Sequence, residues 1–102
     1  MYLHSVKAIA YDIFDALDRN GSEWKKLRDV KVEDDLISIW MSWGISIRNH
    51  YGLWDKDHPL THKWHVDHAS RDIHDGIDYS KDHPDKISFN VLVAVWKMVK
   101  AW

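Results

Sequence analysis

The stretch "PDKISFNVLVAVWKMVKAW", residues 84–102, is the most apolar part of the chain. Pro84 suits the first turn of an α-helix, because proline loses nothing where the backbone N–H is unpaired in any case. The β-branched valines would permit a strand, but the length of the stretch and the spacing of its lysines favour a helix. We therefore predict a helix that begins at Pro84.

Apolar side chains cover most of the circumference of this predicted helix. At about 100° per residue, one face carries Ile87, Val91, Ala94, Val95, Met98 and Trp102. The nearly opposite face carries Phe89, Leu92, Trp96 and Val99. Such a helix is buried on most sides, either as the central helix of a small bundle or with a second copy of the chain on one face. Because monomers rarely expose an apolar face of this size, we expect a homo-oligomer that associates through this helix.

The other helices are predicted from apolar residues at helical spacing. They cover residues 5–21, residues 22–30 as a short helix or a turn, and residues 32–52 and 59–76. Ser5 and Ser22 are suited to cap the first two at their N-termini, while Gly21 and Gly52 are suited to end the first and the third. We therefore predict an all-α fold, a single helical domain over residues 1–102 that forms a small bundle of four to five helices.

Composition narrows the classes of function. The 102 residues are 45% hydrophobic and 29% charged, with a net charge of -2, which gives no electrostatic case for binding a nucleic-acid polymer or a membrane surface. The chain has no cysteine, which excludes a disulfide framework and a thiolate zinc site. It shows neither a signal-peptide pattern nor an apolar run that could cross a bilayer. We therefore expect a cytoplasmic protein.

Tryptophan is unusually frequent, with seven residues in the chain. Three of them lie on the apolar stripes of predicted helices and indicate core positions: Trp40, Trp43 and Trp96. The other four are open to a role as surface anchors at an interface: Trp24, Trp54, Trp64 and Trp102.

A second stretch, "SWGISIRNHYGLW" at residues 42–54, places Arg48 and Asn49 within an apolar run. Gly44 costs ~1 kcal/mol relative to Ala inside a helix, so we expect a neighbour packed closely against it. Arg48 near the end of one helix and Asp85 at the start of another would form an ion pair between them, with His83 capping the second helix. This structural interpretation assigns Arg48 no ligand.

The alternative interpretation makes the same region a ligand pocket. An arginine fork grips a phosphate or carboxylate, and a Trp or Tyr ring stacks on a flat ligand. The predicted ligand-binding residues are Arg48, Asn49, His50, Tyr51, Trp54, His83 and Asp85. Both interpretations stay open, with the ion pair as the main role and ligand binding as an additional one.

Histidines cluster between the two stretches, at positions 58, 62, 65 and 68. Pairs of histidines three or four residues apart on a helix can bind one metal ion, and a third ligand would come from elsewhere. The candidate metal ligands are His62, His65 and Asp72. A solvated polar face is the alternative, so we expect no cofactor other than this candidate divalent metal.

The residues of the two motifs carry a resemblance. The pattern G-x-x-I-R-N-x-x-x-L-W, followed by H-P-D-x-x-S, matches at Gly44, Ile47, Arg48, Asn49, Leu53 and Trp54, and then at His83, Pro84, Asp85 and Ser88. It resembles an uncharacterised family of small phage and prophage proteins over about half of the chain. The chain departs from that family at Lys86, where the family usually has a second acid. The resemblance implies a phage-encoded accessory protein in the host cytoplasm, without implying a mechanism.

Three functions follow as hypotheses. The first is a non-enzymatic protein that binds a host component, as a counter-defence protein that binds a defence protein or sequesters a nucleotide messenger. The second is a metal-dependent hydrolase, such as a phosphodiesterase, that uses the histidine and aspartate cluster. The third is a structural virion accessory protein. No nucleophile-elbow or phosphate-loop motif favours another enzyme class.

Overall fold

The computed structural model describes residues 2–55, 57–63 and 83–102. Within these ranges the chain forms α1 (Val6–Ala16), α2 (Ser22–Asp29), a 3-10 turn η1 (Glu33–Asp35), α3 (Leu36–His50) and α5 (Pro84–Ala101). No strand occurs in these ranges. The predicted all-α bundle is therefore confirmed.

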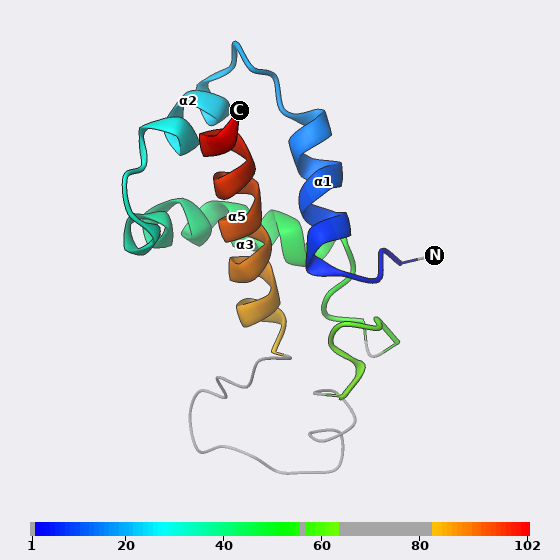
Figure 1. Cartoon of the computed structure of the whole chain (residues 1–102). Coiled ribbons are helices and arrows are strands. Elements are labelled where there is room, and N and C mark those ends of the chain that lie inside the picture. Colours follow the sequence, from blue (N-terminus) through cyan, green and yellow to red (C-terminus); the bar gives the residue numbers. More distant parts are fainter. Residues whose placement is uncertain (1, 56, 64–82) are drawn as a thin grey trace.

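Helix α5 runs through the middle of the bundle, with α1 on one side, α2 near its C-terminal end and α3 crossing it (Figure 1). The side chains of Val91, Leu92, Val95 and Val99 are completely buried, as is that of Ser88. Of the two arrangements that the sequence left open, the described residues show the central helix. The apolar side chains from Ile87 to Val99 are buried or partly buried within the described chain, whereas Trp102 at the end of α5 is 62% exposed.

Local signals explain where the first helices begin. The side chain of Ser5 accepts a hydrogen bond of 3.0 Å from the backbone N–H of Ala8, as the predicted N-cap of α1. The prediction for α2 is wrong by one residue, because Gly21 is its N-cap and Ser22 is already helical. Helix α1 also ends at Ala16, earlier than predicted, because Leu17 adopts an extended backbone conformation.

The end of α3 follows the glycine signal. Gly52 has a φ of 68°, in the left-handed region that glycine adopts without steric cost. The chain therefore turns away from α3 there, as predicted.

The position of Trp24 differs from one possibility that the sequence left open. The sequence left it open as a surface anchor, but its side chain is buried. Its ring lies 5.6 Å from that of Phe14 and 6.2 Å from that of Trp102, centroid to centroid. It therefore joins α2 to α1 and to the end of α5.

The predicted helix over residues 59–76 is only partly described. Residues 62 and 63 are helical, and the rest of that prediction, with His65 and Asp72, lies outside the described residues. Among the helices of the described ranges, none is long and apolar enough to cross a membrane.

Candidate functional site

The predicted ion pair joins α3 to α5. An Nη atom of Arg48 lies 3.3 Å from a carboxylate oxygen of Asp85. The same nitrogen donates a hydrogen bond of 3.2 Å to the hydroxyl of Ser88, and the indole N–H of Trp40 donates another of 3.0 Å. We call Trp40, Arg48, Asp85 and Ser88 the junction. The predicted ion pair between Arg48 and Asp85 is confirmed.

Ser88 is the centre of the junction. Its buried hydroxyl accepts from Trp40 and Arg48 and donates to the backbone carbonyl of Asp85 at 2.8 Å. A serine hydroxyl has one proton and two lone pairs, so its hydrogen-bonding capacity is filled. No local pattern singles out Ser88 for this role, because its partners Trp40 and Arg48 become neighbours only when α3 crosses α5.

Gly44 allows the junction to form. It lies between Trp40 and Arg48 on one face of α3, four residues from each. A Cβ atom at Gly44 would lie 2.6 Å from the indole nitrogen of Trp40 and 2.9 Å from an Nη atom of Arg48. The two long side chains therefore fold over the glycine toward Ser88, which confirms the expected close packing at this position.

Two histidines cap backbone N–H groups in the same way. The Nδ1 atom of His83 accepts from the backbone N–H of Asp85 at 2.9 Å, as the predicted cap of α5. The Nδ1 atom of His58 accepts from the backbone N–H of Leu60 at 3.0 Å. Each histidine is the third residue of a Lys-Asp-His-Pro sequence, at residues 56–59 and 81–84. This repeat is the sequence signal from which the capping role of His58 could have been predicted.

His58 is fully buried. Because its Nδ1 atom accepts a hydrogen bond, the neutral ring carries its proton on Nε2, and Nε2 has no hydrogen-bond partner among the described residues. Burial lowers the pKa of His58 below its usual value, and nearby His4 lowers it further, while the charge of Asp55 opposes the shift. The ring of Tyr2 lies 4.9 Å from that of His58.

The residues predicted to form one pocket lie on different sides of α3. Arg48 and Asp85 belong to the junction, and the ring of His83 lies 5.8 Å from that of Trp54. Asn49, His50 and Tyr51 line hollows on the α1 side. Successive helical residues differ by about 100° in direction, so neighbours of Arg48 in sequence face elsewhere. The structure therefore brings four of the seven residues together, Arg48, Asp85, His83 and Trp54, and leaves the other three on the α1 side.

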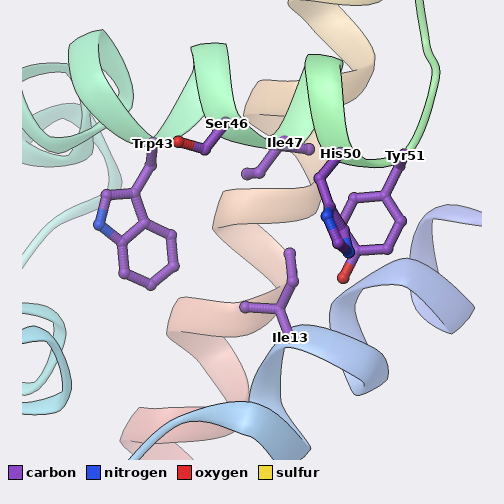
Figure 2. A pocket seen from close by; sticks show the side chains of 6 residues that line it. All are labelled: Ile13, Trp43, Ser46, Ile47, His50 and Tyr51. Carbon is purple, nitrogen blue, oxygen red and sulfur yellow. The ribbon is translucent and has the colours of Figure 1, made fainter.

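An open cleft lies between α1 and α3. Its volume is about 240 Å³, and it is lined by Ile13, Trp43, Ser46, Ile47, His50 and Tyr51. Figure 2 shows Ile13 of α1 opposite Ile47 of α3, with the indole of Trp43 at one end and the rings of His50 and Tyr51 at the other. The indole N–H of Trp43 is already bound to Glu23 at 2.8 Å. The cleft therefore presents mainly carbon surface.

A second hollow of about 400 Å³ adjoins the cleft and shares His50 and Tyr51 with it. The hydroxyl of Tyr51 donates to a carboxylate oxygen of Asp12 at 2.6 Å. Burial raises the pKa of Tyr51 well above its usual range, and the hydrogen bond to Asp12 raises it further. Tyr51 therefore stays a neutral phenol near neutral pH.

The predicted metal site falls largely outside the part of the chain that the structure describes. His62 is exposed, and His65 and Asp72 lie outside the described residues. Within the described ranges, no group of three or more histidine or acidic residues could hold a metal ion. Metal binding by the histidine cluster stays a prediction.

No protein-family model matches the chain, and neither a curated protein nor a solved structure matches it.

Proposed function

We propose that the chain is a binding protein without catalytic activity that takes up an apolar or aromatic side chain of a partner protein in the cleft between α1 and α3. The single observation that carries the proposal is this cleft of about 240 Å³ with its largely apolar lining.

The size of the cleft favours one anchoring side chain. Pockets for whole drug-sized ligands measure about 300–1,000 Å³, and an engineered cavity of about 150 Å³ holds benzene. A cleft between these sizes suits an indole, phenol or branched aliphatic group. Aromatic anchors in such pockets carry most of the binding energy at protein interfaces.

The charges around the cleft favour a protein over a nucleotide messenger. Among the described residues that line the cleft and the adjoining hollow, none is a lysine or an arginine, and Asp12 supplies a negative charge. A phosphate is bound most strongly by charged lysine and arginine side chains. The arginine nearest in sequence, Arg48, is bound to Asp85 and Ser88.

The resemblance to small phage proteins supplies the setting of the proposal. In that setting the partner is a host protein, and a host defence protein is the partner that the resemblance favours. Self-association of the chain is a separate prediction, which sedimentation velocity tests.

The cleft is tested by titrating isotope-labelled protein with indole, p-cresol and AMP while recording amide chemical shifts. We expect indole and p-cresol to bind in the millimolar range and to shift the amides of Ile13, Trp43, Ser46 and Ile47. We expect AMP to leave them unchanged. Stronger binding of AMP than of indole at these amides would contradict the choice of a protein partner.

A matched pair of variants locates the binding. Ser46→Phe places a ring at the cleft, whereas Ser42→Phe places the same ring elsewhere on α3; both serines are exposed. We expect Ser46→Phe to abolish the indole shifts and Ser42→Phe to preserve them. A host protein that binds the chain should likewise lose binding to Ser46→Phe and keep binding to Ser42→Phe. Equal binding to both variants would show that the cleft is not the site.

A further inference from the structure

The hollow beside the cleft differs from the cleft in charge. Its lining includes the carboxylate of Asp12, the amide of Asn49 and the rings of Tyr2 and Tyr51, whereas the cleft presents mainly carbon surface. A carboxylate attracts a cation, and the face of a tyrosine ring accepts one. The lining of the hollow therefore suits a cationic group.

The negative charge of Asp12 is not neutralised within the described part of the chain. Its carboxylate accepts a hydrogen bond of 2.6 Å from the hydroxyl of Tyr51, and a neutral phenol leaves the charge of the carboxylate in place. Lys7 is the cation nearest to it in the sequence of α1, and its Nζ atom lies 5.9 Å from the ring centroid of Tyr11. Asp12 forms no ion pair with a described residue. A cation from outside the chain is thus the group that would complete this site.

The opposite wall of the hollow is also close to acidic residues. The hydroxyl of Tyr2 donates a hydrogen bond to a carboxylate oxygen of Asp55. This hydrogen bond raises the pKa of Tyr2, and burial and the charges of Asp55 and Asp57 raise it further. Among the described residues, negative charge therefore lies near the hollow both on α1 and in the loop after α3.

The cleft and the hollow meet at Tyr51. The ring of Tyr51 stands at one end of the cleft (Figure 2), and its hydroxyl is bound to Asp12 of the hollow. Side chains two residues apart in an extended segment point the same way and lie about 7 Å apart. One segment of a partner could therefore place one side chain in the cleft and another in the hollow.

We propose that the hollow binds a lysine or arginine side chain of the same partner segment whose apolar side chain fills the cleft, with Asp12 as the paired anion. This inference rests on the proposed function and adds the chemistry of the partner segment, which carries an aromatic or branched aliphatic residue and a basic residue two positions away. Arginine suits the hollow better than lysine, because its planar guanidinium both pairs with a carboxylate and stacks on a tyrosine ring.

Two peptides that differ only in charge test the inference. They are N-acetyl-Trp-Gly-Arg-amide and the same peptide with citrulline, the neutral isostere of arginine. Isotope-labelled protein is titrated with each peptide at low salt while amide chemical shifts are recorded. Both should shift the amides of Trp43 and Ile47, and the arginine peptide should shift those of Leu3 and Gly52 more strongly.

The arginine peptide should bind about three- to tenfold more tightly than the citrulline peptide, as expected for an exposed ion pair combined with a cation–π contact. Added salt should reduce this ratio, because it screens exposed charges.

A matched pair of variants assigns the preference to one carboxylate. Asp12→Asn keeps an oxygen that can accept from the hydroxyl of Tyr51 but removes the charge, so the two peptides should bind it equally. Asp34→Asn changes the net charge by the same amount at an exposed residue of η1, before the other end of α3. It should keep the parent's preference for arginine.

The failure of this inference can be told apart from failure of the proposed function. If neither peptide nor indole shifts the amides of the cleft, the proposed function is wrong and this inference falls with it. If both peptides bind at the cleft with equal affinity, this inference alone is wrong. A preference for arginine that Asp12→Asn retains in full would overturn the assignment of Asp12 as the paired anion.

Discussion

The two sides of α3 are built in opposite ways. Toward α5, polar groups satisfy one another around the Ser88 hydroxyl, and the junction leaves no room for a Cβ atom at Gly44. Toward α1, Ile13 and Trp43 border an open cleft whose surface is mainly carbon. The permanent charge of Arg48 therefore helps to hold α3 against α5, and the apolar flank toward α1 is the side to which we assign the proposed partner.

This difference predicts how variants on each side behave. Changes at the junction should lower the free energy of unfolding, whereas changes in the cleft should alter binding with little effect on stability.

The largest effect should come from Arg48→Ala. It removes a charged donor to Ser88 and an ion pair, and hydrogen bonds to charged groups contribute about 1.5–3 kcal/mol. Asp85 is 44% exposed, so solvent screens the carboxylate that is left behind. We expect the free energy of unfolding, measured by heat or urea, to fall by about 2 kcal/mol. This loss is smaller than that expected for a fully buried pair. Lys97→Ala, on the exposed side of α5, serves as the control, within about 0.5 kcal/mol of the parent.

Gly44→Ala should have the next largest effect. Alanine favours a helix over glycine by about 1 kcal/mol, but its Cβ atom would meet Trp40 and Arg48 at less than 3 Å. Overpacking typically costs about 1–3 kcal/mol, so we expect a net loss of about 1 kcal/mol by urea unfolding. A gain in stability would show that the two side chains can reach Ser88 by another path.

The two capping histidines also lie in different regions. His83 caps α5, which carries the junction, whereas His58 lies in the loop after α3. Burial holds the pKa of His58 below its usual value, so below about pH 6.5 the unfolded chain binds a proton that the folded chain does not. Stability should therefore fall on acidification, by about 1 kcal/mol per pH unit, until the folded pKa is reached.

His58→Asn tests this assignment. Asparagine can still accept from the backbone N–H of Leu60 but does not titrate, so the pH dependence of unfolding should flatten between about pH 5 and 7. His50→Asn, at an exposed position in the cleft, should leave the parent's pH dependence in place. If the free energy of unfolding of His58→Asn depended on pH as strongly as that of the parent, other groups would cause the acid sensitivity.

The smallest effect should come from Tyr51→Phe. It removes the hydrogen bond to the exposed Asp12 but keeps the ring that lines the cleft. A single hydrogen bond of this kind contributes about 0.5–1.5 kcal/mol, and we expect the lower end, with indole binding retained. Loss of indole binding would mean that the hydroxyl takes part in recognition.

The sequence was sufficient for features that depend on local chemistry. Proline at the start of α5, Ser5 before α1 and opposite charges at two helix ends predicted the helix starts and the pairing of Arg48 with Asp85. The sequence also suffices to show that His50 faces away from Arg48, since two residues turn the direction by about 200°. A single pocket that contains both side chains is incompatible with that rotation.

The cleft could not be predicted in this way. It exists because Ile13 of α1 faces Trp43 and Ile47 of α3, and no local pattern specifies how two helices joined through α2 lie against each other.

A double-mutant cycle on Arg48 and Asp85 tests most directly whether the charge of Arg48 stabilises the contact between α3 and α5. The free energies of unfolding are measured for Arg48→Ala, Asp85→Ala, the double variant and the parent. We predict that the double variant is more stable than the sum of the single losses implies, with a coupling energy of about 1 kcal/mol, as expected for residues in contact. A coupling energy of zero, with Arg48→Ala as stable as the parent, would contradict the role of Arg48 in joining α3 to α5.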